Sequence, residues 1–252
     1  MNINFQKELK NHLKLLDVTK KSNIVVYANL SSFADYSKKL PVAVLDTLLK
    51  VIGSKGSMIM PTYSLDVPKN FIFDIRKIAN LSSISMLSKI FFLKKKVNRS
   101  HSPIHNHIGI GPKSKFLLKT NEYGSFGQNS DFYYMKKLNF KLIMLGCGPF
   151  EGATYLHQLE TLVGVPYRKW IKLKKKIKKK NKIKTIEVDY YSNVSKYKAD
   201  FDKVFELIKK RKGNIKKAGL KFGSSYSVDF KEMLKHCLPM LKKNKFFFVN
   251  RN

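Results

Sequence analysis

The residues best suited to chemistry in this chain are a threonine, a histidine and a glutamate spaced three positions apart, Thr154, His157 and Glu160. They follow the apolar run 142–148, which is typical of a buried strand that ends at a glycine. Residues three apart lie near one another on a helix, so the spacing predicts a helix that presents all three on one face. A carboxylate beside an imidazole orients the ring and stabilises its protonated form, while the free ring nitrogen accepts a proton. The pattern therefore indicates a general base, His157 with Glu160. The plainer alternative is a surface helix that carries both residues by chance.

Three further histidines, His101, His105 and His107, alternate along a polar and glycine-containing stretch. On a strand they would face one side, an arrangement that metal sites also use. No carboxylate stands close in sequence and Pro103 interrupts the run, so we expect no metal. We expect instead that these side chains line a polar pocket.

The elements that must position these residues alternate between strand-like and helix-like segments. This alternation predicts an α/β fold, a single compact domain over 1–252 with a mixed or parallel central sheet covered by helices. Residues 1–21 carry apolar side chains at helical spacing and predict an amphipathic N-terminal helix. Strands are expected at 24–26, 58–60 and 142–145, and helices at 42–52, 84–93, 116–120, 200–210 and 228–241.

Residues 169–191 form a Lys-rich segment in which nine lysines stand between Lys172 and Lys184 among alternating apolar residues. The alternation and a turn at 180–182 predict a long, basic β-hairpin. In one interpretation the lysines keep an exposed edge from aggregating. In the other, the hairpin is a basic arm near the site that attracts phosphates or an anionic substrate.

Composition limits the function classes. The formal charge is +33, but only five of the 50 basic residues are arginine. Arginine is the residue whose guanidinium group forms two parallel hydrogen bonds with a phosphate or a guanine base. We therefore expect no specific nucleic-acid partner. No apolar run approaches the roughly 20 residues of a membrane span, and the first 21 residues lack the apolar centre of a secretory signal. With two cysteines and no disulfide framework, a cytoplasmic location is expected.

Six segments in a fixed order resemble the aminoglycoside 3-N-acetyltransferase family, and the resemblance extends from about residue 23 to about residue 241. These segments are 23–32, 53–64, 99–112, 126–131, 154–160 and 165–168. The resemblance implies an enzyme that moves an acetyl group from acetyl-coenzyme A to an amino group of a sugar. It also implies direct transfer with His157 as general base and Glu160 beside it.

The same resemblance supplies the other site assignments. It implies that the cofactor is bound by residues after the first two strands and in the Arg-Ser segment, namely Asn29, Leu30, Ser31, Thr62, Arg99 and Ser100. It implies that a small-molecule amino-sugar acceptor lies against His101, His105, Asp131 and Thr154. A homodimer is left open.

Two departures from the family pattern keep other interpretations open. The usual His-Pro pair is Ser102-Pro103 here, and the usual His-Ser-Ser-Leu-like turn is replaced by Tyr27 to Leu30. A catalytically degenerate module that binds a sugar or an acyl carrier is therefore the alternative function. The alternative mechanism makes Cys147 an acyl carrier activated by His157.

The charge balance bears on the acceptor. Aminoglycosides are polycations, and 50 basic against 17 acidic residues oppose them. Carboxylates such as Asp131, Glu151 and Glu160 could still create a local acidic pocket, since exposed charges are screened beyond about 8–10 Å. The balance favours an anionic or neutral amino sugar, such as a nucleotide-linked one.

Overall fold

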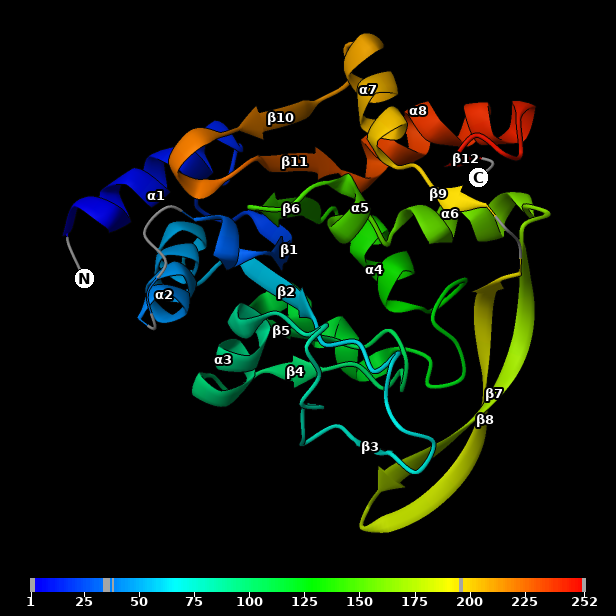
Figure 1. Cartoon of the computed structure of the whole chain (residues 1–252). Helices are drawn as coiled ribbons and strands as arrows, with labels where there is room; N and C mark the ends of the chain where they lie inside the picture. Colours follow the sequence, from blue (N-terminus) through cyan, green and yellow to red (C-terminus); the bar gives the residue numbers. More distant parts are fainter. Residues whose placement is uncertain (1–2, 34–36, 38, 195–196, 251–252) are drawn as a thin grey trace.

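The computed structural model of the chain describes residues 3–33, 37, 39–194 and 197–250. At its centre lies a seven-stranded sheet in the order β10-β11-β6-β1-β2-β5-β4 (Figure 1). Strand β1 (Asn23–Ala28) pairs in parallel with both β2 (Ser57–Pro61) and β6 (Lys141–Leu145). The outer strands pair antiparallel, and they are β4 (Asn98–Arg99), β5 (His107–Ile110), β10 (Ile215–Ala218) and β11 (Ser225–Asp229). The predicted α/β fold is confirmed, and its sheet is mixed.

Alternating side chains of the central strands bury both faces of this sheet, as the period of two in a strand requires. Ile24, Val26 and Ile143 pack on one face with the helices α1 (Ile3–Leu15), α2 (Leu40–Ile52) and α3 (Met86–Lys94). Val25 and Leu142 pack on the other face with α4 (Asp131–Lys137), α6 (Leu156–Val163), α7 (Asp202–Lys210) and α8 (Phe230–Lys243). The short helix α5 (Pro149–Gly152) joins β6 to α6. The two helical layers stand on either side of the sheet in Figure 1.

The basic hairpin forms as predicted and is slightly longer than expected. Its strands are β7 (Arg168–Lys179) and β8 (Lys182–Asn193). Lys180 and Asn181 make the two-residue turn, and both have positive φ, 47° and 62°, which suits the right-handed twist of the strands. Strand β3 (Ile72–Asp74) adds in parallel to β7 near this turn and completes a second sheet. In Figure 1 the hairpin curves away from the main sheet, and its tip comes to lie beside β3.

The remaining elements are short. Strands β9 (Lys198–Ala199) and β12 (Val249–Asn250) pair with each other. In the described ranges the 3₁₀ turns are η1 (Leu30–Ser32), η2 (Pro112–Lys119) and η3 (Leu220–Phe222). None of the helices in the described ranges is long and apolar enough to cross a membrane.

Several expectations need correction. The first helix ends at Leu15 rather than near residue 21, and Asp17 and Lys21 take positive φ in the turn that leads to β1. The segment 116–120 is part of a 3₁₀ turn, not an α-helix. The expected helix 228–241 starts only at Phe230, because Val228 pairs with Leu142 in the sheet. This antiparallel edge of β10 and β11 was not predicted.

Candidate active site

The site lies at the edge of the sheet where the three parallel strands end. Asn29 follows β1, Thr62 follows β2, and Gly146 and Cys147 follow β6. Loops at this edge are the usual binding region of open α/β sheets. Gly146 has φ +64°, and a Cβ there would clash with the Ser32 hydroxyl and stand only 2.5 Å from the Asn29 carbonyl. Only glycine therefore lets the β6 turn approach the β1 turn this closely.

Helix α6 brings His157 and Glu160 together as the spacing predicts. His157 Nδ1 lies 2.7 Å from Glu160 Oε2, with the Glu160 side chain fully buried and 18% of the His157 side chain exposed. Thr154 is not on this helical face, because α6 begins after Tyr155. Its carbonyl accepts a hydrogen bond from the His157 amide at 3.1 Å, so it holds the start of the helix.

Glu160 is held by residues from the segment that follows α6. Its Oε1 accepts a hydrogen bond of 2.9 Å from the Tyr167 hydroxyl. Its Oε2 lies 2.7 Å from Arg168 Nε, a close ion pair without hydrogen-bond alignment. Burial acts to raise the pKa of Glu160, but the charges of His157 and Arg168 and the hydrogen bonds from His157 and Tyr167 outweigh burial and lower it. Glu160 is therefore a buried carboxylate ion.

This ionisation fixes the roles of the two ring nitrogens of His157. A carboxylate ion can only accept hydrogen bonds, so Nδ1 carries the proton of neutral His157 and donates to Glu160. The lone pair then stands on Nε2, which lies 3.5 Å from Arg168 Nη2. A bond of that length is weak. The tautomer is the one that a general base requires, with its basic nitrogen turned away from the carboxylate.

Aromatic rings enclose the imidazole and connect it to His105. The His157 ring meets Phe126 at 6.1 Å and Phe201 at 5.4 Å between ring centroids, both edge to face. Phe126 in turn lies 5.0 Å from the buried ring of His105, over which Tyr190 of β8 stacks at 6.1 Å. Burial, with the nearby charges of His157, His107 and Arg168, places the pKa of His105 well below its ordinary value. His105 is therefore a neutral ring close to His157.

A second histidine–carboxylate pair lies deeper in the same layer. His107 Nδ1 is 2.6 Å from Asp131 Oδ2, and both side chains are almost completely buried. His107 Nε2 lies 3.3 Å from the Tyr63 hydroxyl, which lies 2.5 Å from that of Tyr27. Burial raises the pKa of Tyr27 to about 12 despite the hydrogen bonds from Tyr63 and Thr154. The structure thus places Asp131 in the interior against His107, and it brings the Thr154 side chain to the two tyrosines.

The expected cofactor residues divide into two groups. Asn29, Leu30 and Ser31 line a groove of about 450 Å³ whose other wall includes Ser85 and Lys89 of the α3 region. The Asn29 side chain caps η1 by accepting from the Ser31 amide at 3.2 Å. Asn29 and Ser31 are exposed at the end of β1, whereas Leu30 is buried beneath them in the core.

The second group is internal. Thr62 donates to Asn106 Oδ1 at 2.6 Å, and the Ser100 hydroxyl accepts from the His107 amide at 2.9 Å. Arg99, 4% exposed, donates to Asn106 Oδ1 through Nε and Nη2 and to the carbonyls of Asp74 and Lys77 through Nη1. These three residues fix the backbone that carries His105 and His107, and their polar groups are bonded within the fold.

Cys147 lies at the predicted strand end, but its thiol is poorly suited to act as a nucleophile that accepts an acyl group. Only 6% of the residue is exposed. Burial, together with the charge of Glu151, raises the pKa of its thiol to about 12. The thiolate that a nucleophile requires is therefore scarce at neutral pH.

The three histidines of the polar stretch do not share one surface. The rings of His105 and His107 both contact Tyr63, at 4.9 and 5.2 Å between centroids. His101 lies apart, in a pocket at the tip of the hairpin. Within the described part of the chain no group of three histidine, cysteine or acidic side chains is arranged to hold a metal ion.

Sequence reasoning assigned no role to the residues that hold Glu160. Tyr167 and Arg168 stand in the family-like segment 165–168, which was the available signal. Phe126 likewise stands in the family-like segment 126–131, whereas Phe201 gave no signal, because it reaches His157 only through the packing of a distant segment. The hairpin base is part of the site, since β7 begins at Arg168 and the Tyr191 carbonyl accepts from Arg168 Nη1 at 3.3 Å.

Comparison with solved structures finds the same fold in several proteins. The YokD protein from Bacillus subtilis aligns with a TM-score of 0.80 and 18% identity, over 95% of this chain and 99% of that one. A mutant of aminoglycoside acetyltransferase AAC(3)-IVa in complex with a gentamicin aligns with a TM-score of 0.79 and 19% identity, over 97% and 91%. AAC-IIIb as a binary complex with CoASH gives 0.81 and 16%, over 98% of both chains. None of the curated protein sequences matches this chain.

The low sequence identities to these solved structures show only that the fold is shared, whereas a match to a family model shows the family. The model of the aminoglycoside 3-N-acetyltransferases matches residues 25–242. This range includes the main sheet, apart from the first two residues of β1, and it also includes α6 and the base of the hairpin. The chain therefore belongs to the aminoglycoside 3-N-acetyltransferase family, whose members are acyltransferases.

Proposed function

We propose that this protein is an acetyl-coenzyme A-dependent N-acetyltransferase that acts on an amino group of an amino sugar. The acetyl group passes directly from the thioester to the amine, with His157 as general base. The observation that carries the proposal is the geometry of α6. Its buried, ionised Glu160 accepts the hydrogen bond of His157 Nδ1, with 2.7 Å between Nδ1 and Oε2, and this leaves the lone pair on Nε2 of a partly exposed ring.

The proton path follows from this tautomer. A sugar ammonium cannot attack, so it first gives one proton to His157 Nε2, and Glu160 stabilises the imidazolium that forms. The neutral nitrogen then bonds to the thioester carbon, the carbon–sulfur bond breaks, and its electron pair leaves with sulfur. The thiolate of coenzyme A takes the proton from His157, and the nitrogen loses its second proton to solvent as the amide forms.

Arg168 has a defined part in this scheme. Its ion pair with Glu160 keeps that carboxylate charged in a fully buried position. The same guanidinium stands 3.5 Å from Nε2 through Nη2 and limits the directions from which an amine can approach. We assign it a positioning role.

The groove at the end of β1 fits the co-substrate. It offers the hydroxyls of Ser31 and Ser85, the amide of Asn29 and the ammonium of Lys89 around a volume of about 450 Å³. A groove that combines these polar groups and one cation with the apolar side chains of Leu30, Ile84 and Met86 suits the amide-containing arm and the phosphates of coenzyme A. AAC-IIIb, which shares the fold, has been solved with CoASH. In this scheme Asn29, Leu30 and Ser31 hold the co-substrate, and Thr62, Arg99 and Ser100 support the loop beside it.

The test is thioester consumption, followed as release of free coenzyme A from acetyl-coenzyme A. The purified protein is mixed with a panel of amino sugars that includes kanamycin-type antibiotics and phosphate-linked sugars. Acceptor-dependent release that is lost in His157→Ala supports the proposal. Absence of release with every acceptor, alongside calorimetric binding of a sugar, would instead identify a binding module that performs no chemistry.

A further inference from the structure

Three hydroxyl groups meet next to the turn that leads into α6. The hydroxyl oxygens of Tyr27 and Tyr63 are 2.5 Å apart, and the Thr154 hydroxyl hydrogen-bonds to both tyrosines. Tyr27 is buried at the end of β1, whereas Tyr63, after β2, and Thr154, before α6, are partly exposed. We call these three side chains the hydroxyl cluster. It lies at the edge of the sheet that carries the candidate site.

The hydroxyl cluster is anchored to the enclosed pair of His107 and Asp131. His107 Nδ1 lies 2.6 Å from Asp131 Oδ2, and His107 Nε2 lies 3.3 Å from the Tyr63 hydroxyl. A carboxylate ion only accepts hydrogen bonds, so neutral His107 carries its proton on Nδ1 and has a lone pair on Nε2. The His107 side chain is fully enclosed, so bulk water does not reach this lone pair. The Tyr63 proton therefore points to Nε2, because an unsatisfied buried polar group is costly.

This anchor sets the direction of every hydrogen bond in the hydroxyl cluster, because each hydroxyl has a single proton. Tyr63 donates its proton to His107, so Tyr27 donates to the Tyr63 oxygen and Thr154 donates to the tyrosines. Burial raises the pKa of Tyr27 to about 12 and holds the pKa of Tyr63 well above its ordinary value, so both remain protonated at neutral pH. The Thr154 proton thus points inward, and the lone pairs of Oγ1 remain for a partner outside the hydroxyl cluster.

Thr154 and His157 belong to one closed ring of contacts. The Thr154 carbonyl accepts from the His157 amide at 3.1 Å, which closes a single turn and keeps the two residues roughly 6 Å apart along its axis. On the other side, ring centroids are 4.9 Å apart for Tyr63 and His105, 5.0 Å for His105 and Phe126, and 6.1 Å for Phe126 and His157. The hydrogen bond between Thr154 and Tyr63 completes the ring. One small group can therefore meet both Thr154 and His157.

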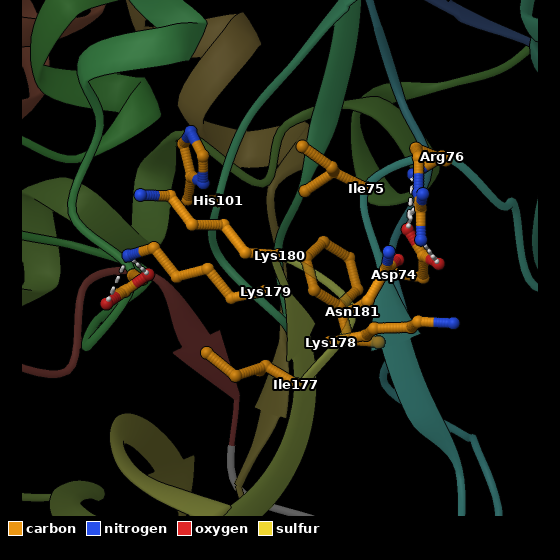
Figure 2. Close-up of a pocket in the computed structure, with 11 residues that line it drawn as sticks. Asp74, Ile75, Arg76, His101, Ile177, Lys178, Lys179, Lys180 and Asn181 are labelled. Carbon is orange, nitrogen blue, oxygen red and sulfur yellow. Dashed lines mark hydrogen bonds and ion pairs between the residues drawn. The ribbon is translucent and has the colours of Figure 1, made fainter. Parts of the chain in front are cut away.

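The hairpin tip takes no part in this ring. His101 lines the pocket at the tip together with Lys179 and Lys180 (Figure 2). Lys178 of the same pocket lies ten residues along β7 from Arg168, roughly 33 Å on an extended strand. Recognition of the reacting group is therefore left to residues next to His157.

We propose that Thr154 Oγ1 accepts a hydrogen bond from the reacting amine, and that Tyr27 and Tyr63 are positioning residues that keep the Thr154 proton turned away from it. The proposal rests on the proposed function for the identity of the amine. A sugar ammonium directs one N–H to His157 Nε2 and a second N–H to Thr154. After His157 has taken the first proton, the bond to Thr154 holds the nitrogen while its lone pair meets the thioester.

The two acceptors also select the reacting group. A neutral primary amine has two protons and satisfies both Thr154 and His157, whereas a sugar hydroxyl has one proton and leaves one acceptor without a partner. A site built to hydrogen-bond a group discriminates strongly against an analogue that lacks one of the bonds. The arrangement therefore favours transfer to nitrogen over transfer to the hydroxyls of the same sugar.

The test removes the hydroxyl and keeps the side-chain shape in Thr154→Val. Thr154→Ser restores a hydroxyl, and Tyr63→Phe removes the group that sets its direction. The matched control is Thr161→Val on α6, whose hydroxyl donates to the Gln158 carbonyl at 2.8 Å. The acceptors are kanamycin and a uridine-diphosphate-linked amino sugar. Calorimetry without acetyl-coenzyme A measures their Kd, and release of coenzyme A per folded molecule measures kcat and KM.

Thr154→Val should raise the Kd and KM of an acceptor roughly tenfold, the effect of losing one hydrogen bond to a charged group, and should leave KM for acetyl-coenzyme A within twofold. Thr154→Ser and Thr161→Val should stay within about threefold of the unmodified protein. In a Tyr63→Phe background, Thr154→Val should raise the acceptor Kd less than twofold further, because the direction of the Thr154 proton is already lost. Full additivity of the two changes would overturn the role of Tyr63.

The other outcomes separate this proposal from the proposed function. A lower kcat of Thr154→Val with unchanged acceptor Kd would make Thr154 a donor to the thioester oxygen and overturn the proposal. Acetyl transfer with Kd, KM and kcat all unchanged would overturn it and leave the proposed function standing. Acceptor binding that Thr154→Val weakens, in a protein that releases no coenzyme A, would support the proposal and contradict the proposed function. A protein that neither binds nor acetylates an acceptor contradicts both.

Discussion

His107 and Asp131 form a second histidine–carboxylate pair, with Nδ1 and Oδ2 2.6 Å apart, close to the 2.7 Å of His157 and Glu160. The two pairs differ in access, since the His107 side chain is fully enclosed and 18% of the His157 side chain is exposed. A base must reach its substrate, so equal geometry leads to different roles. We assign the reactive role to His157 and a structural one to His107.

The enclosed pair predicts a stability effect. Asp131→Ala leaves the buried His107 ring without its partner, and this should lower the free energy of unfolding by about 2–4 kcal/mol. Urea unfolding followed by circular dichroism measures the loss. Asp131→Asn retains an acceptor oxygen and should lose less. Turnover per folded molecule of Asp131→Asn should stay within about threefold of that of the unmodified protein. A loss as large as that of His157→Ala would instead assign the reactive role to His107 and Asp131.

The reactive pair predicts a catalytic effect. His157→Ala should lower turnover by roughly 10²–10⁴-fold, the usual consequence of losing a general base. Glu160→Gln should lower it less, because the imidazole remains while its orientation and charge partner weaken. The control is His236→Ala on α8, which removes another histidine paired to a glutamate, with His236 Nε2 3.2 Å from Glu232 Oε2. Turnover of His157→Ala within a factor of two of the unmodified protein would contradict the assignment.

The enclosed thiol predicts that no acyl-enzyme forms. With its pKa raised to about 12 by burial, Cys147 should not be acetylated when the protein is mixed with acetyl-coenzyme A alone. Intact-mass spectrometry checks this, and Cys147→Ala should retain most of the activity. The buried Cys237, whose pKa burial also raises to about 12, serves as a reference for slow background acetylation. A stoichiometric adduct on Cys147 that an amine discharges would replace direct transfer with a covalent route.

The lowered pKa of Glu160 predicts a pH-dependent contribution to stability. Because the folded-state pKa lies below the ordinary value of 4.5, ionised Glu160 stabilises the fold above about pH 4.5. That contribution is lost as the pH falls through the folded-state pKa. The difference in unfolding free energy between the unmodified protein and Glu160→Gln should therefore be largest near pH 7 and shrink below pH 4.5. Urea unfolding across this range is the measurement, and a difference that grows on acidification would show that the folded-state pKa is not lowered.

Much of the fold was predictable because its signals are local. The apolar runs that form β1, β2 and β6 predict strands through their own composition. The alternation of apolar and charged residues in β7 and β8, with a turn between them, predicts a hairpin. The edge formed by β10 and β11 was missed because Val228 is placed by its pairing with Leu142, a residue far away in the sequence. No local pattern encodes such a partner.

The sequence by itself determined the pair His157 and Glu160, since a three-residue spacing in a helix brings two side chains together whatever surrounds the helix. It also determined the basic character of the hairpin. Only the tertiary structure decided that Arg168 and Tyr167 keep Glu160 ionised and that His107 and Asp131 are sealed from solvent. It likewise placed the hairpin tip against segment 73–76, and residues of both line one pocket. Burial, ion pairing and cavities depend on which distant segments pack together, and that choice is made by the whole fold rather than by neighbouring residues.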